Sequence, residues 1–357
     1  MIPSETGFLA GDAARFVMDF VFLCGVTLLL CLSAPTIASV LGVVDHPDGR
    51  RKKHAAPTPL VGGLAIVAPF VVYCVALALD DAGNRLYPAL AITSAAFFAL
   101  GLADDQHDVK PKYRLAAATG IALVVLNISP DEFIVDRLLF TFADDPVGLY
   151  PFSLLFTALC LIGLVNAMNM ADGINGLALG MCLIWTILLV VYGPAELSPL
   201  LVAFAAALAI TLVFNLAGRL FLGDSGTYAI SMVVAMLAIY SYGRSPTTLN
   251  ADIVALWFLV PVFDCLRLMA WRLASGRSPF SADKHHLHHF LGRWMGPGWV
   301  LVAYLALIGV PCALALIWPA WTLVWGLLVA LVYAAILARA TRPVLRRWLR
   351  SPQRRLL

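Results

Sequence analysis

Residues 88–108 read PALAITSAAFFALGLADDQHD, an uncharged run that ends in three aspartates. Apolar runs of about this length cross a bilayer core of about 30 Å as helices. The whole chain of 357 residues is 61% hydrophobic and 13% charged, with mean hydropathy +0.89, whereas soluble domains are about half apolar and a quarter charged. Similar runs recur along the chain without strand-like alternation. The sequence therefore predicts an all-α polytopic membrane protein.

About eleven transmembrane spans are predicted. They lie near residues 16–43, 61–79, 88–103, 113–129, 152–171, 175–192, 198–218, 226–242, 251–272, 299–318 and 320–338. No room for a soluble domain remains, so residues 1–357 are predicted to form a single integral-membrane domain with a basic tail at 339–357. The seven cysteines all fall inside these spans without CxxC spacing, which indicates packing and not redox or zinc chemistry.

The basic residues divide very unevenly between the two sets of loops. All but Arg15, Arg85, Arg137 and Arg244 of the 24 lysines and arginines fall in one set, which includes the tail. By the positive-inside rule this set is cytoplasmic, so the N-terminus lies outside and the C-terminus inside. All seven histidines and a group of aspartates fall on the same side, and such a cluster suggests a site for a metal ion and phosphates.

The third predicted span ends in Asp104, Asp105 and Asp108, followed by Lys110 and Lys112. Neighbouring carboxylates repel one another unless a cation or a proton intervenes. One interpretation is a general base with electrostatic control of a metal–phosphate site. The alternative is a solvated acidic helix end.

The fifth predicted span ends in Asn166-Ala-Met-Asn169-Met-Ala-Asp172-Gly-Ile-Asn175. Asn166, Asn169 and Asp172 are three residues apart, so they share one helix face. Buried polar groups near a membrane are expensive and tend to be functional. Helix capping by Asn and Asp is the alternative.

Two further cytoplasmic loops carry residues suited to phosphates. In loop 219–225, glycines would let backbone amides approach a phosphate while Asp224 binds a hard cation, although Gly-Asp-Ser-Gly is also an ordinary turn. Loop 44–60 contains four consecutive basic residues, Arg50 to Lys53, and His54. They offer cations to phosphates, or serve only as a topology signal.

The last long cytoplasmic segment, 273–298, holds Arg277 and four histidines within five residues, His285, His286, His288 and His289. Their spacing does not match a structural zinc site, and no cysteine is near. Imidazoles that donate to a diphosphate fit this basic segment better. The arginine-rich tail is expected to face anionic lipid headgroups and not nucleic acid.

Taken in order, the segments 44–60, 104–112, 172–175, 219–225 and 273–298 resemble the polyprenyl-phosphate N-acetylhexosamine-1-phosphate transferases, the MraY- and WecA-like glycosyltransferase family 4. The stretch Ser278-Pro-Phe-Ser-Ala-Asp283 leading to His286-Leu-His288-His289 is similar to the WecA-type branch. The resemblance covers roughly residues 40–292, and its eleven-helix, N-out topology agrees with the independent prediction above.

The resemblance implies roles for individual residues. Asp104 and Asp105 would be the catalytic pair, with Asp108 completing the acidic motif, while Asp224 and Asn169 would ligate Mg²⁺, for which Mn²⁺ could substitute. Phe221 would stack on uracil, and the turn of Asp172, Gly173 and Asn175 would read its edge. The further implied substrate-binding residues are Arg51, Lys52, His54, Asn166, Arg277, His286, His288 and His289.

Two positions depart from the family pattern. Bacterial relatives usually have Asp where Asn175 stands, whereas the eukaryotic enzyme is Asn-like there, so uridine recognition is expected to survive with altered strength. The first loop carries one residue more than in WecA-type proteins, which leaves either Arg50 or Arg51 at the usual arginine position, and counting back from His54 favours Arg51.

The implied function is transfer of N-acetylglucosamine-1-phosphate from UDP-GlcNAc to undecaprenyl phosphate, giving polyprenyl-diphospho-GlcNAc and UMP. This reaction initiates a cell-surface glycan in the bacterial inner membrane, with the site on the cytoplasmic face. The alternatives are another UDP-N-acetylhexosamine, or a membrane transporter or flippase. Direct attack and a covalent aspartyl intermediate both stay open. A homodimer is expected by analogy, and the outer segment 130–151 receives no role.

Overall fold

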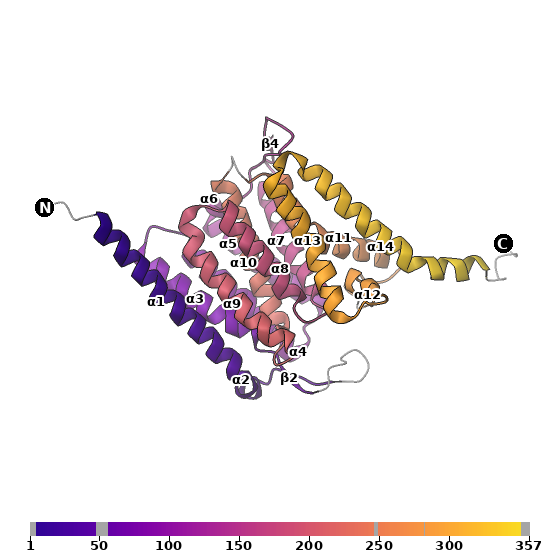
Figure 1. The fold of residues 1–357 in the computed structure, drawn as a ribbon, viewed down its shortest axis with the longest axis horizontal. Coiled ribbons are helices and arrows are strands. Elements are labelled where there is room, and N and C mark those ends of the chain that lie inside the picture. The colour runs from indigo at the N-terminus through magenta and orange to yellow at the C-terminus, as the bar shows by residue number, and fades with distance from the viewer. Residues whose placement is uncertain (1–4, 48–55, 246–248, 282, 351–357) are drawn as a thin grey trace.

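The computed structural model describes residues 5–47, 56–245, 249–281 and 283–350 as a bundle of helices (Figure 1). The long helices are α1 (Glu5–Leu32), α3 (Gly62–Asp80), α4 (Leu86–His107), α5 (Pro111–Ile128), α7 (Ser153–Ala171), α8 (Leu177–Tyr192), α9 (Ser198–Leu216), α10 (Gly223–Arg244), α11 (Ala251–Ala274), α13 (Pro297–Ile317) and α14 (Thr322–Arg350). Short elements join them: α2 (Ala34–Leu41), α6 (Pro130–Phe133), α12 (Leu287–Leu291) and the 3₁₀ turns η1 (Ala195–Leu197) and η2 (Pro319–Trp321).

The all-α polytopic architecture is confirmed. In the described part of the chain, nine helical segments are long and apolar enough to cross a membrane. Helices α5 and α8 occupy the two other predicted spans: α8 is a shorter apolar helix of 16 residues, and α5 begins with the polar Lys112 and Arg114. The first predicted span is divided between α1 and α2, where Pro35 in the first turn of α2 provides no N–H for a continuous helix.

Helix α10 forms the centre of the bundle. In α10, 89% of the apolar stretch that could span a membrane is buried. The corresponding share is 17% in both α1 and α14, which lie at opposite ends of the long axis of the molecule (Figure 1). The largest contacts of α10 are with α4, α7 and α3. The many exposed leucines and valines of α1 and α14 suit helices whose outer faces meet lipid.

Helices α3, α4 and α10 touch through glycines. A Cβ on Gly101 of α4 would lie 2.4 Å from the backbone oxygen of Asp224, and one on Gly63 of α3 would lie 2.4 Å from Cα of Gly226. Small residues permit such close approach of helix backbones within a membrane. The contact brings the acidic end of α4 directly against the first turn of α10.

Two small hairpins lie at opposite ends of the bundle (Figure 1). Strand β1 (Val44–Asp45) pairs antiparallel with β2 (Thr58–Pro59), at the end where α2 and α12 also lie. Strand β3 (Arg137–Leu138) pairs antiparallel with β4 (Val147–Gly148) at the other end, within the segment 130–151. The end of β2 and the start of α3 also form backbone hydrogen bonds with Phe221, which precedes α10. Phe221 N–H donates to Pro59 O at 2.8 Å, and Gly62 N–H donates to Phe221 O at 2.9 Å.

Replacing Gly101 by alanine tests the contact between α4 and α10. We expect Gly101→Ala to lower the free energy of unfolding by about 1–3 kcal/mol, since the added methyl group meets backbone that cannot rotate away. Gly120→Ala in α5 is the matched control: nothing lies within 4 Å of its Cβ position, so helix propensity should raise stability by about 0.5–1 kcal/mol. Unfolding in detergent, followed by tryptophan fluorescence, measures both, and equal stabilities would contradict the packing.

Candidate active site

The carboxylate of Asp104 joins three helices near the end of the bundle that carries β1 and β2. Its Oδ2 accepts hydrogen bonds from Arg114 Nη1 of α5 at 2.6 Å and from the hydroxyl of Tyr228 of α10 at 2.7 Å, and its Oδ1 accepts from Val109 N–H at 2.9 Å. Asp104 is buried, and a buried charge is tolerated when it is paired and hydrogen-bonded. The arginine, the hydroxyl and the backbone N–H therefore satisfy both oxygens of the buried Asp104 carboxylate.

Asp105 accepts hydrogen bonds from the first turn of α10. Its two oxygens take the N–H groups of Asp224 at 2.8 Å and Ser225 at 3.0 Å. These N–H groups have no partner within their own helix, and a carboxylate at a helix N-terminus is favoured by the helix dipole. Gly223 begins α10 with φ +74°, and a Cβ there would lie 2.7 Å from Asp105 Oδ2, so this junction requires glycine.

The end of α7 meets the same turn of α10. Asn169 Nδ2 donates to Asp224 Oδ1 at 2.6 Å, and the hydroxyl of Thr227 donates to Asp172 Oδ2 at 2.9 Å. The predicted shared face is confirmed for Asn169 and Asp172, which both reach α10. Asn166 instead donates to Ile162 O of its own helix at 2.8 Å.

The remaining predicted residues are less closely joined to this centre. Asp108 is exposed and caps α4 in the left-handed conformation with φ 49°. Asn175 is exposed, and Phe221 is half-buried with its backbone tied to Pro59 and Gly62. Arg277 is exposed, with its guanidinium 5.8 Å from the centre of the Trp271 ring. Arg51, Lys52 and His54 lie outside the described residues.

The histidine segment packs against the turn that follows α7. A Cβ on Gly173 would lie 2.3 Å from Nε2 of His288, so only glycine allows this approach. His288 is buried, and within the described part of the chain neither of its ring nitrogens has a hydrogen-bond partner. A neutral imidazole has one donor and one acceptor nitrogen. Buried ring nitrogens without a partner commonly mark the place of a ligand or a water molecule.

The three histidines form a layer of rings. The ring of His286 lies parallel to that of His288, with centroids 5.5 Å apart and 7° between the planes, and the rings of His288 and His289 are 4.2 Å apart. Burial and the neighbouring rings of His289 and His286 lower the pKa of His288 to about 3, so this ring is neutral at pH 7. The His288 ring can therefore donate one hydrogen bond and accept one, but it carries no positive charge for a phosphate.

Side chains of α11 and α14 that received no predicted role hold this segment in place. Arg272 and Asp283 form a buried ion pair at 2.7 Å, and Asp264 bonds to His286 Nδ1 at 3.1 Å. The hydrogen bonds from Arg272 and from His285 N–H outweigh the effect of burial and lower the pKa of Asp283. An ionisable residue within an apolar helix, as Asp264 is, could have been recognised from the sequence as a candidate.

The oxygen groups around Asp224 suit a hard cation. Mg²⁺ is usually bound by one or two carboxylates, with waters and substrate phosphates completing its octahedron. Asp224 provides a carboxylate, and a half-turn of the Asn169 amide brings its oxygen to the same place. Among the described residues no three His, Cys, Asp or Glu side chains form a metal cluster. The arrangement therefore fits an ion held jointly by the protein and a phosphorylated substrate.

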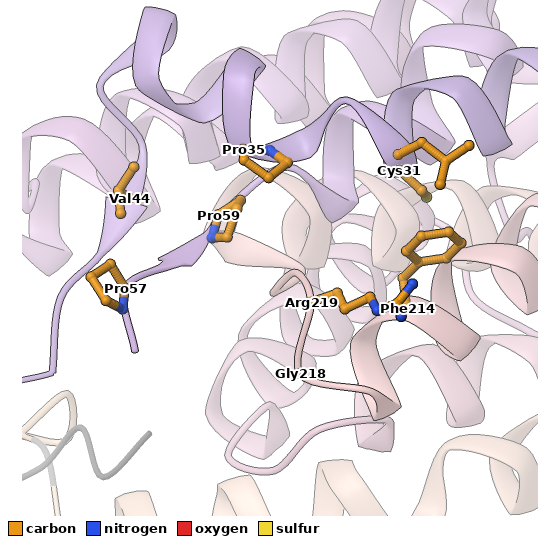
Figure 2. A pocket seen from close by; sticks show the side chains of 9 residues that line it. Cys31, Pro35, Val44, Pro57, Pro59, Phe214, Gly218 and Arg219 are labelled. Carbon is orange, nitrogen blue, oxygen red and sulfur yellow. The ribbon is translucent and has the colours of Figure 1, made fainter. Parts of the chain in front are cut away.

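A cavity of about 510 Å³ lies beside the β1–β2 hairpin (Figure 2). Its wall is formed by the end of α1, the start of α2, both strands and the end of α9, and its lining residues include Cys31, Pro35, Pro59 and Phe214. Arg219 lies on this wall, with its guanidinium 5.9 Å from the centre of the Phe214 ring. Among the described residues that line it, the cavity thus combines mostly apolar side chains with the guanidinium of Arg219.

Comparison with known proteins gives the class of this fold and site. Residues 87–242 match the family described as glycosyl transferase family 4. The undecaprenyl-phosphate alpha-N-acetylglucosaminyl 1-phosphate transferase of Escherichia coli O157:H7 is 31% identical over 353 residues, which cover 92% of each chain. The chain belongs to glycosyl transferase family 4 and is a membrane-embedded transferase.

Similar relatives occur in other bacteria. The protein of the same name from Yersinia pestis is 30% identical over 346 residues, which cover 90% of this chain and 91% of the relative. A probable undecaprenyl-phosphate N-acetylglucosaminyl 1-phosphate transferase of Bacillus subtilis (strain 168) is 29% identical over 287 residues, or 78% and 77% of the two chains. The resemblance seen in the ordered motifs is thereby confirmed.

The buried His288 should make stability fall in acid. Because its folded pKa of about 3 lies below the value near 6.5 of an unfolded chain, its contribution is complete above pH 6.5 and is lost as the pH falls toward 3. In that window the free energy of unfolding should drop by about 1.4 kcal/mol per pH unit on account of this one group.

We expect His288→Gln to show a shallower decrease of unfolding midpoint between pH 6.5 and 5 than the parent protein. His46→Gln, at an exposed position, is the control and should follow the parent. Midpoints come from thermal unfolding in detergent at a series of pH values. Parallel curves for the parent and His288→Gln would contradict a buried neutral ring.

Proposed function

We propose that this protein transfers N-acetylglucosamine-1-phosphate from UDP-N-acetylglucosamine to undecaprenyl phosphate, releasing UMP and leaving undecaprenyl-diphospho-N-acetylglucosamine. The observation that carries the proposal is the junction of Asp105, Asn169 and Asp224 at the start of α10, in a chain similar over most of its length to transferases of this name. A hard cation held by a carboxylate and an amide oxygen is suited to a diphosphate.

We also propose that the site faces the cytoplasm of a bacterial inner membrane, in a chain that crosses it eleven times. Three observations support this topology. The basic residues concentrate in one set of loops, α5 and α8 occupy the two spans beyond the nine, and elements of that set, including β2 and α12, lie at one end of the bundle (Figure 1). The loops 44–60, 104–112, 172–175, 219–225 and 273–298 would then surround one site. A homodimer stays a prediction.

In the proposed reaction an oxygen of the lipid phosphate forms a bond to the β-phosphorus of UDP-GlcNAc, and the bond from that phosphorus to UMP breaks. A phosphate monoester has a second pKa of about 6, so the attacking group needs little help to lose its proton at pH 7. Mg²⁺, when bound, would neutralise charge on the diphosphate. Asp224 and Asn169 would hold it, and Asp105 fixes the position of Asp224 through its backbone N–H.

The hydrogen bonds of Asp104 and Asp105 support a structural role for the aspartate pair. Both oxygens of Asp104 and both of Asp105 accept hydrogen bonds from the protein. These contacts tie Asp104 to α5 and α10 and Asp105 to the start of α10, although both oxygens of Asp105 and Oδ1 of Asp104 each keep a lone pair for a further contact. We therefore propose that the pair mainly orders the first turn of α10, and the acid–base roles of Asp104, Asp105 and Asp108 stay predictions.

The uridine and the sugar would lie on two segments beside Asp224: the turn after α7 with Phe221, and the histidine segment. We propose that Phe221 and the turn of Asp172, Gly173 and Asn175 hold the uracil. The histidine segment and Arg277 would lie over the sugar and the diphosphate. The approach of His288 to Gly173 supports a continuous surface between the two segments.

The reaction is tested by UMP release from purified protein with UDP-GlcNAc, undecaprenyl phosphate and Mg²⁺. We expect release to require lipid and Mg²⁺, and Asp224→Ala to lower the rate by more than about 100-fold, as removal of one electrostatic contact to a transition state does. Asp145→Ala, an exposed aspartate in the segment 130–151, is the control and should retain the parental rate. Absence of UMP with folded protein and any UDP-N-acetylhexosamine would refute the proposal.

The cavity beside Arg219 is a candidate for the acceptor lipid. An apolar wall with one guanidinium matches a prenyl chain that ends in a phosphate. We expect Arg219→Ala to raise KM for undecaprenyl phosphate about 10–100-fold, the size of one hydrogen bond to a charged group, and to leave KM for UDP-GlcNAc unchanged. Arg293→Ala, at another exposed arginine of the same set of loops, is the control. Equal lipid KM values in parent and Arg219→Ala would exclude the cavity as the lipid site.

A further inference from the structure

Asp264 lies in α11 and collects donors from three separate parts of the chain. Its Oδ1 accepts from Arg267 Nη2 at 2.8 Å and from the hydroxyl of Tyr333 of α14 at 2.6 Å. Its Oδ2 is 3.1 Å from His286 Nδ1 and accepts from Leu287 N–H at 3.3 Å. The carboxylate is almost completely buried, with its side chain 3% exposed.

This environment requires an ionised carboxylate. Arg267 is always charged, and it also donates from Nε to the Tyr333 oxygen at 2.6 Å, which leaves the tyrosine hydroxyl to donate to Asp264. A protonated carboxyl group would lose the charge that pairs with Arg267, and its O–H could point only toward His286. Hydrogen bonds from a cation, a hydroxyl and a backbone N–H together stabilise the anion.

An ionised carboxylate can only accept hydrogen bonds, so the proton between Asp264 and His286 must belong to Nδ1 of the histidine. In a neutral imidazole the other nitrogen, Nε2, then carries a lone pair and accepts. No described residue forms a hydrogen bond with Nε2 of His286, which leaves it available to a ligand. An unprotonated diphosphate offers only acceptors, whereas hydroxyl and amide N–H groups of a sugar offer donors.

We propose that Asp264 is a positioning residue that fixes His286 in the Nδ1–H tautomer, so that Nε2 accepts a hydrogen bond from a hydroxyl or amide N–H of the transferred sugar. The inference rests on the proposed function for the identity of the ligand, but the tautomer itself does not depend on it. It assigns His286 to the sugar and separates it from the groups that face phosphates.

The stacked rings of His286 and His288 connect Asp264 to the centre of the site. His286 lies parallel to His288, and His288 lies against Gly173, next to the Asp172 carboxylate that bonds to α10. Rotation of the His286 ring would therefore disturb His288 as well. Asp264 thus fixes both the tautomer and the plane of the ring that begins the layer.

The substitution Asp264→Asn keeps the shape of the side chain almost unchanged but replaces one acceptor oxygen by a donor NH₂ group. Its amide nitrogen must face either Arg267 and Tyr333 or His286 and Leu287 N–H. Arg267 cannot accept a hydrogen bond, whereas His286 can, by moving its proton to Nε2. The variant is expected to place its amide toward His286 and to convert Nε2 from an acceptor into a donor.

Tyr333→Phe is the matched control. It removes one hydrogen bond to the same carboxylate and the acceptor of Arg267 Nε, but it leaves an anion facing His286, so the tautomer should not change. Because these hydrogen bonds act on His286 only through Asp264, kcat/KM should fall by less than about tenfold and by less than in Asp264→Asn. For Asp264→Asn we expect kcat/KM for UDP-GlcNAc to fall about 10–100-fold, as for other residues that orient a functional histidine, with KM for the lipid unchanged.

The tautomer is measured directly by ¹⁵N NMR of full-length protein labelled at histidine, in detergent micelles, with the His286 signals assigned from a His286→Gln variant. We expect a protonated Nδ1 and an unprotonated Nε2 at neutral pH in the parent and in Tyr333→Phe, and the reverse in Asp264→Asn. A protonated Nε2 in the parent would overturn the inference, even if Asp264→Asn did not fold.

The kinetic measurement decides the ligand. A loss in Asp264→Asn that fell on KM for the lipid, or a loss no greater than that of Tyr333→Phe, would overturn the assignment of His286 to the sugar. If the parent released no UMP with any UDP-N-acetylhexosamine, the proposed function would fail while the NMR result still decided the tautomer. The two failures are therefore distinguishable.

Discussion

The carboxylate of Asp105 satisfies two N–H groups at the start of α10, and the geometry of the site depends on this contact. The first N–H groups of a helix have no intrahelical partner, and burying them unpaired would be costly. A charged acceptor from a neighbouring helix removes that cost and compensates part of its own desolvation through the helix dipole. The end of α4 and the start of α10 are thereby fixed relative to each other, and Asp224 with them.

The glycines of α3, α4 and α10 make this contact sterically feasible. The close approach at Gly101 brings the end of α4, and with it Asp105, against the backbone of α10, while the one at Gly63 packs α3 against the same turn. Because α10 is buried along most of its length, its first turn has little freedom to move away from these neighbours. The contacts of α10 with α3 and α4 therefore determine both the packing at the centre of the bundle and the position of the polar side chains at its end.

The sequence predicted the helices and the polar ends well because both follow from local patterns. Apolar length placed the spans, and the spacing of Asn169 and Asp172 predicted their common face. Contacts between distant segments could not be read in this way: nothing in the sequence pairs Asp264 with Tyr333, 69 residues away. The division of the first span at Pro35 was missed because its apolar composition continues across the break. The places of Arg51, Lys52 and His54 stay predictions.

The pairing of β2 with Phe221 joins the two ends of the loop 44–60 to the segment that leads into Asp224. Any ligand whose binding favours one position of this hairpin also favours one position of the start of α10. Thermodynamic linkage makes such an effect reciprocal, so a cation that stabilises the same position strengthens binding at the hairpin by an equal factor. The order in which substrate and metal bind would then depend on their concentrations, and neither ligand would have to bind first.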